Sequence, residues 1–571
     1  MESNKRQKDV EEKNHSQHIA IEETNDVFIK HSKRGGWATM PFILGSISTL
    51  TLAAGGWTGN LIVYLITKYN IKSIDATQVF NVVFGCMYLF PIAGAILSDS
   101  FFGLFAVIAG FSLVSLLGVT LMTLTSILLS LRPPTCTNML LPCESPSTLQ
   151  YGVLYAILGL ACMGIGGTRF TVATMGADQF EDSNSVGTYF NWYFFVYYVA
   201  GFISTTVIIY VQDNVSWTVG FGICVVCNTF GVILFLSGKN FYRKIKLKGS
   251  PFTSIARVIV AAVRKRNVPS TNMQYNYDAN DKSTIVPSDR FRYLNHGALK
   301  IESDGSKERS WSLSTVQEVE DLKTLIKIVP LWSSSVLLSA TIGMFNNFTI
   351  LQALSMDRHL GGSQFKIPAS SFLSLDVLAT SITIFLLNRV IFPTWQKVIS
   401  RPLTPLQRIG MGHVLNVVGL VVSALVEIQR LHSASDHNLI GLSMATTTIV
   451  PFSALWLLLP LTIVGISQAF IFPGQILLYY QEFPASLRST SSAMISLLVA
   501  VGFYLSTAIT SLMRNKTTWL KDNLNDGRLD IAYWVLAATG VVNFGYFFVC
   551  AKMFEHKHVK QDKNMDNISS S

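Results

Sequence analysis

The sequence has few charged residues. Only 14% of its 571 residues are Asp, Glu, Lys or Arg, and 50% are hydrophobic, whereas soluble globular proteins are about 25% charged. Residues 38–67 and 101–131 contain no charged side chain, and each run exceeds the roughly 20 residues that cross a bilayer as a helix. The deficit excludes an ordinary soluble protein and predicts an integral membrane protein.

Metal-ligand patterns and catalytic clusters are also missing. Cys224 and Cys227, two of the seven cysteines, form a Cys-x-x-Cys pair inside an apolar run, where packing explains them better than metal binding. The predicted helices hold no cluster of His, Asp or Glu suited to acid–base chemistry. We therefore expect no metal, no cofactor and no enzyme activity. The first apolar run begins near Trp37 after a polar stretch, which predicts a retained soluble tail rather than a cleaved signal peptide.

Twelve apolar segments are long enough to span a membrane, six on each side of a polar, basic stretch. We predict an all-α integral membrane protein with twelve transmembrane helices in two six-helix halves. This arrangement is typical of the major facilitator fold, in which substrate binds midway between the halves. The predicted helices are 39–66, 77–97, 104–130, 151–175, 188–210, 217–238, 329–354, 369–391, 407–428, 453–479, 490–512 and 531–550.

The predicted organisation has five parts. Within the linker, residues 252–263 are amphipathic and are predicted to lie along the membrane surface. The parts are a cytoplasmic tail at 1–36, the first half at 37–238, a basic cytoplasmic linker at 239–327, the second half at 328–551 and a cytoplasmic tail at 552–571.

Lys and Arg residues orient these helices. With both termini cytoplasmic, 33 of them lie inside and 10 outside, and the remaining one, Arg169, lies within a helix. Positive residues favour the cytoplasmic side, so topology explains the net charge of +10 and a nucleic-acid partner is disfavoured. The loop 132–150 is then outside, where Cys136 and Cys143 either form a disulfide or stay reduced.

Motifs along almost the whole chain resemble one transporter family. In "GAILSDSFFG", Gly94, Asp99 and Gly103 match the gating loop between helices 2 and 3 of major facilitators. The chain resembles the plant nitrate and peptide transporter family, the plant branch of the proton-dependent oligopeptide transporters, over roughly residues 34–553. "GGTRFT", "GFGI" and the start of the first helix resemble its nitrate-excretion subgroup. The most specific motifs are "RGGW" at 34, "LRPPTC" at 131, "GADQF" at 176, "YVQDN" at 210, "LTPLQRIGMG" at 403, "QEFP" at 481 and "WLKDNLNDGRLDIAYW" at 519.

The chain departs from this family at the proton-coupling motif. The resemblance implies Glu-x-x-Glu-Arg in the first helix, but the aligned residues here are Ile47, Leu50 and Thr51. Hydrocarbon side chains cannot hold a proton, and a threonine hydroxyl does not ionise near neutral pH. Since no Asp or Glu occurs from residue 38 to 74, we expect proton coupling through this helix to be weak or absent.

The resemblance also places a substrate site around Arg169, which occupies the position of a family cation in the fourth helix. Gln468 stands where members commonly carry a glutamate facing that cation. A buried arginine stays protonated, so its charge needs an anion or another carboxylate nearby. Tyr198 replaces an Asn common in peptide carriers, and Ile342 replaces a histidine that binds substrate in some nitrate carriers. We take these four as candidate substrate-binding positions.

Asp376 could neutralise Arg169 in place of a substrate anion. It lies in the predicted helix 369–391, where it could neutralise Arg169 in one conformation and release it in another, or bind a proton. Alternatively, it sits near the outer end of its helix and is simply solvated. A permanent pair between Asp376 and Arg169 would weaken the case for an anion.

These residues favour a plasma-membrane carrier for nitrate or a similar small anion that works by alternating access. We expect low affinity and efflux, because about 100 mV of inside-negative potential favours export of each anion by roughly 2.3 kcal/mol. Chloride transport, or proton-coupled symport of peptides or organic anions through Asp376, remains an alternative. A transport-inactive nutrient receptor is a more remote one.

Overall fold

The structure is a computed structural model, and it is mostly helical. Two short strands, β1 (Met356–Asp357) and β2 (Val450–Ser453), pair in parallel. Within the described residues, twelve helical spans are long and apolar enough to cross a membrane, which confirms the predicted twelve-helix architecture. The structure describes residues 35–134, 144–243, 251–267, 274–277, 287–288, 290–300, 311–360, 365–400, 403–440, 449–482 and 490–569.

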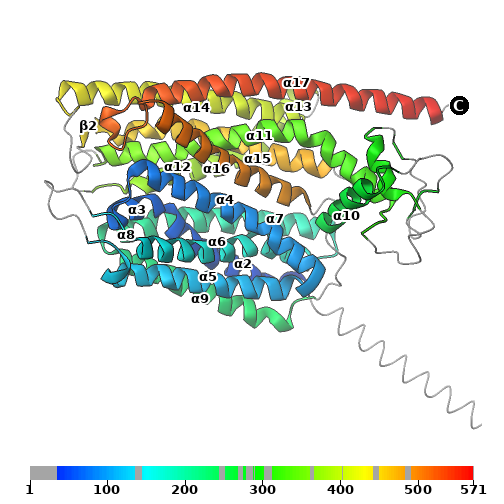
Figure 1. The fold of residues 1–571 in the computed structure, drawn as a ribbon, viewed down its shortest axis with the longest axis horizontal. Coiled ribbons are helices and arrows are strands. Elements are labelled where there is room, and N and C mark those ends of the chain that lie inside the picture. The colour runs from blue at the N-terminus through cyan, green and yellow to red at the C-terminus, as the bar shows by residue number, and fades with distance from the viewer. Residues whose placement is uncertain are drawn as a thin grey trace, which may run out of the picture.

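Figure 1 shows the two halves lying against each other with their helices in a common direction. The first half contains α2 (Met40–Gly59), α3 (Leu61–Tyr69), α4 (Ser73–Leu97), α5 (Leu104–Ile127), α6 (Thr148–Ala177), α7 (Ser183–Ile203), α8 (Ile209–Asn214) and α9 (Trp217–Ser237). The second half contains α11 (Val316–Ser355), α12 (Leu373–Leu386), α13 (Phe392–Ile399), α14 (Pro405–Asp436), α15 (Leu458–Glu482), α16 (Thr490–Lys516) and α17 (Leu529–Ser569).

Short helical segments join or extend these helices. π-helical turns lie at Ser98–Phe102, Ser204–Ile208 and Leu387–Ile391. The 3₁₀ segments are Gly36–Thr39, Leu129–Leu131, Gly238–Asn240, Arg292–Ala298, Ala369–Phe372, Ala454–Leu457 and Leu524–Asp526.

Part of the linker packs on the second half of the molecule. Its helix α10 (Pro251–Arg264) lies at one end of the molecule, beside α11 (Figure 1). Val258 and Ala262 on its apolar face are buried in a cluster with Leu294 and with Val316 of α11. Ile259 and Val263 of the same helix are exposed, so the placement of α10 along the membrane surface stays a prediction. In addition, α11 begins at Val316, so the boundary predicted at 328 falls inside a continuous helix.

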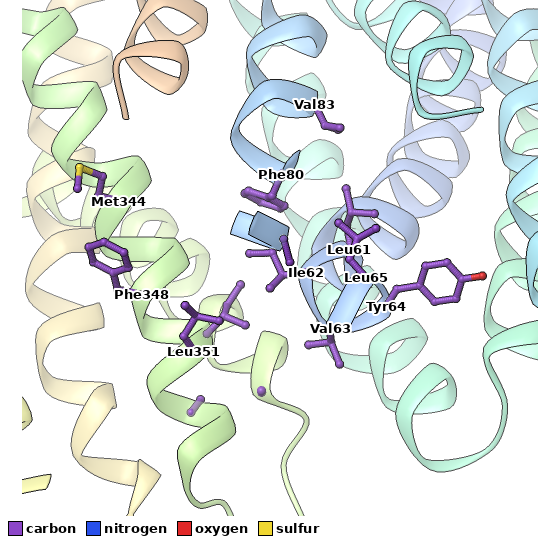
Figure 2. Packing of buried hydrophobic residues seen from close by; sticks show 14 of the residues in the cluster. Leu61, Ile62, Val63, Tyr64, Leu65, Phe80, Val83, Met344, Phe348 and Leu351 are labelled. Carbon is purple, nitrogen blue, oxygen red and sulfur yellow. The ribbon is translucent and has the colours of Figure 1, made fainter. Parts of the chain in front are cut away.

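The two halves are sealed at the end predicted to be extracellular. Figure 2 shows Met344, Phe348 and Leu351 of α11 across from Phe80 of α4 and Ile62 of α3, and all five belong to one buried apolar cluster. Burying such side chains stabilises the closed contact by roughly 1.5–3 kcal/mol each. The described structure therefore has the mouth at this end closed.

Polar contacts reinforce the same seal. The Asn347 amide of α11 donates to the Asn81 side-chain oxygen of α4 at 2.6 Å. Asn81 in turn donates to the Ser506 hydroxyl of α16 at 3.1 Å. Closer to the surface, Arg514 of α16 forms an ion pair with Asp75 of α4. Each contact joins one half to the other, so all three must break if the outer mouth is to open.

Cysteines in the described residues carry free thiols, and these are Cys86, Cys162, Cys224, Cys227 and Cys550. Cys136 and Cys143 lie outside the described residues, so their pairing stays a prediction.

Candidate substrate site between the two halves

Glycines let α6 approach its neighbours closely. A Cβ built on Gly166 would lie 2.8 Å from the Met87 carbonyl oxygen of α4, and one built on Gly164 would lie 2.3 Å from the Ser115 backbone nitrogen of α5. Any side chain at these positions would push the helices apart. Because residues three apart share a helix face, Arg169 follows Gly166 on the side that faces α4.

Three tyrosines hold Arg169. Its guanidinium carbon lies 4.8 Å from the ring centroid of Tyr88 on α4 and 5.1 Å from that of Tyr197 on α7. The guanidinium also donates a hydrogen bond to the Tyr197 hydroxyl, and the Tyr193 hydroxyl donates to the Arg169 carbonyl oxygen at 3.0 Å. Each cation–π contact contributes about 0.5–2 kcal/mol, depending on desolvation. All these partners are neutral, so they hold the cation without cancelling its charge.

Asp376 does not pair with Arg169. Its carboxylate accepts two hydrogen bonds from the side-chain nitrogen of Gln468 on α15, at 3.1 and 2.9 Å. Asp376 lies in the first turn of α12 but is only 6% exposed, so it is near the helix end without being solvated. Gly465 permits this contact between α12 and α15, since a Cβ there would lie 2.7 Å from the Asp376 carbonyl oxygen. Among the described residues, Arg169 takes part in no ion pair.

Tyr198 lies near both charges. It lies on α7, next to the residue that accepts the Arg169 hydrogen bond, and it interacts electrostatically with both Arg169 and Asp376. Its helix α7, in the first half, packs against α12, which carries Asp376 in the second. The structure thus brings together Arg169, Tyr198, Asp376 and Gln468 at the interface of the halves.

The remaining candidates are packing residues. Ile342 is buried in a small apolar cluster with Ile471 of α15, apart from the contacts of Arg169. Ile47 belongs to a buried cluster within the first half, Leu50 is buried, and Thr51 is half-buried. The positions that match the family's proton motif are thus mainly occupied by core side chains.

The proposed gating loop has backbone requirements at both of its glycines. A Cβ on Gly94 would lie 3.2 Å from the Gly167 carbonyl oxygen of α6, so a side chain there would require α6 to shift by a few tenths of an ångström. Gly103 has φ +76°, a conformation that glycine adopts without strain. Asp99 lies in the π-helical turn Ser98–Phe102 between them.

Reasoning from the sequence missed the tyrosines around Arg169. A signal was present, because Tyr189, Tyr193 and Tyr197 are spaced by four residues and so share one face of α7. All three contact α6, and the Tyr189 hydroxyl donates to the Ala173 carbonyl oxygen at 3.2 Å. Tyr88 carries no comparable signal, since only the packing of α4 on α6 brings it to Arg169.

Comparison with known proteins places this site in a family context. A model described as "POT family" matches residues 105–526. Protein NRT1/ PTR FAMILY 2.7 of Arabidopsis thaliana is 46% identical over 542 residues, which cover 94% of this chain and 96% of the relative. Protein NRT1/ PTR FAMILY 2.9 of the same plant is 35% identical, covering 94% of this chain and 95% of the relative. These matches confirm the resemblance drawn from the motifs.

Solved structures agree in fold. The in meso crystal structure of the POT family transporter PepTSo has a TM-score of 0.65 at 18% identity, covering 91% of this chain and 99% of that one. A crystal structure of a peptide transporter POT in complex with sulfate has a TM-score of 0.63 at 14% identity, covering 91% and 96%. At such low identity, the likeness shows the fold alone. Because the family model and the plant relatives match most of its length, the chain belongs to the POT family of multi-pass membrane transporters.

Proposed function

We propose that this transporter carries nitrate or a similar small inorganic anion across the plasma membrane by alternating access. The observation that supports this is Arg169, a permanent cation at the interface of the halves whose described partners are all neutral. An arginine in this setting gains most from an anion that offsets the cost of its desolvation. Its planar fork of donors matches a planar oxyanion.

The same geometry supports weak binding and efflux. One guanidinium already held by tyrosines offers a single charged contact, so we expect low affinity. The first helix has no titratable group at Ile47, Leu50 or Thr51, so flux follows the electrochemical gradient. At an interior potential of about −100 mV, export of each monovalent anion is favoured by roughly 2.3 kcal/mol.

Flux measurements in proteoliposomes test this proposal. Wild-type protein should release trapped nitrate faster than protein-free vesicles, and Arg169→Ala should reduce the rate to that background while the protein remains folded. Arg257→Ala is the matched control, since Arg257 pairs with Glu318 in the linker region and should retain the wild-type rate. Undiminished nitrate flux in Arg169→Ala would contradict the assignment.

Two carrier alternatives are separated by the same vesicles. Chloride presents the same charge as nitrate without the planar shape, so competition by chloride reports whether shape matters. The buried carboxylate of Asp376 favours proton-coupled symport of peptides or organic anions as a second candidate. That function predicts uptake driven by an acidic exterior, whereas the proposed one predicts similar nitrate flux at two pH values. Binding of nitrate without any flux would instead favour a receptor.

A further inference from the structure

Two charges of opposite sign, the half-buried Arg169 and the buried Asp376, lie at the interface of the halves, and each is held by neutral groups. Arg169 belongs to the first half and is held by tyrosines. Asp376 belongs to the second half and is held by the amide of Gln468. We infer that Asp376 is the counter-charge that lets the empty carrier reverse, and that Gln468 holds it away from Arg169 while the anion is bound. This inference rests on the proposed function.

Charge balance gives the physical reason. With Asp376 ionised, the empty site carries one positive and one negative charge and is neutral overall. Bringing the two together would let the empty carrier move its halves without a buried, uncompensated cation, which is otherwise strongly unfavourable. When a monovalent anion neutralises Arg169, the loaded site carries one net negative charge. The loaded step therefore moves charge across the membrane, and the empty return step moves none.

The contacts fit an exchange of partners. Asp376 and Gln468 lie on α12 and α15, which pack within the second half and are drawn close at Gly465. Because both residues belong to the second half, these hydrogen bonds hold Asp376 until Arg169 approaches it across the interface. The distance from Asp376 to Arg169 crosses the interface, so it changes with that movement. Tyr198 lies near both charges and belongs to the half that carries Arg169.

The test compares two modes of transport in the same proteoliposomes. Net efflux into nitrate-free buffer requires return of the empty carrier, whereas exchange of labelled internal nitrate for external nitrate does not. In Asp376→Asn, the empty site keeps an uncompensated cation, so net efflux should fall by about 100-fold. Exchange should fall far less, because the anion accompanies Arg169 in both directions. Asp376→Glu keeps the charge and should restore most of the net efflux.

Several results would overturn the inference. Net efflux that survives in Asp376→Asn, or net efflux and exchange that fall together in folded protein, would each do so. A measurement on the wild-type protein adds a criterion that needs no variant: each nitrate should carry one net negative charge, and electroneutral flux would contradict the scheme. Absence of any anion flux in wild-type vesicles would instead refute the proposed function itself, and this inference with it.

Discussion

Replacing Gly166 by alanine tests how the position of Arg169 is set. The added Cβ would lie 2.6 Å from the Phe90 Cβ and 2.8 Å from the Met87 carbonyl oxygen, whereas unstrained contacts at these atoms need about 3.5–4.0 Å. Neither neighbour can rotate away, because both atoms are fixed by the α4 backbone. The helices must separate by several tenths of an ångström or more, and Arg169 would move off the Tyr88 ring.

The magnitude follows from two opposing effects. Overpacking costs typically about 1–3 kcal/mol, and contact with backbone-fixed atoms favours the upper end of this range. Replacing glycine by alanine within a helix increases the free energy of unfolding by roughly 0.5–1 kcal/mol. The Gly166→Ala variant should therefore be less stable by about 2 kcal/mol and should transport nitrate more slowly.

Gly159→Ala on the same helix is the matched control. A Cβ there meets nothing within 4 Å, so only the helix-propensity gain applies and stability should rise slightly. Thermal unfolding in detergent and vesicle flux should separate the two variants in both measurements. If Gly166→Ala and Gly159→Ala are equally stable and equally active, close packing of α6 on α4 does not position the arginine.

Three further predictions concern charges elsewhere in the molecule. Glu427→Ala should destabilise the second half by about 3–5 kcal/mol, measured by thermal unfolding, because fully buried Arg430 loses a two-point contact at 2.7 and 2.8 Å. Asp75→Asn removes an exposed ion pair with Arg514 across the outer seal; it should cost at most about 1 kcal/mol and should increase labelling of thiols introduced behind the seal. The backbone N–H and the imidazole of His359 lower the pKa of Asp357 below its ordinary value. The ionised Asp357 therefore stabilises the fold above pH about 4, and this contribution is lost as pH falls through the lowered pKa. Asp357→Asn should abolish this part of the acid sensitivity in unfolding curves.

The membrane spans followed from the sequence because lipid leaves the chain little choice. A backbone inside a bilayer must satisfy its own hydrogen bonds, so long uncharged runs become helices. The start of α11 was missed because its first turns are charged and lie outside the apolar run. A capping box formed by Thr315 and Glu318 marks that start, and its Thr-x-x-Glu pattern is readable in the sequence.

The packing of the linker helix was not predicted, for a related reason. The amphipathic pattern of residues 252–263 predicts one buried face without saying what covers it. In the structure, Val258 and Ala262 face protein, and membrane lipid would have satisfied the same pattern. The choice depends on how α10 docks against α11, which periodicity does not contain.

The sequence by itself determined that this is a twelve-helix membrane transporter with an isolated cation, Arg169, at a position where the family's usual acidic partner is Gln468. These features could be predicted because membrane-spanning helices and motif positions depend on the hydropathy and spacing of residues within a few helical turns. Only the tertiary structure decided that tyrosines from α4 and α7 hold Arg169, and that Asp376 turns to Gln468, 92 residues away along the chain. These contacts depend on how each helix is rotated and how closely it packs. The rotation and packing distance of each helix depend on the volumes of side chains on both sides of an interface. The sequence of one segment does not contain this information.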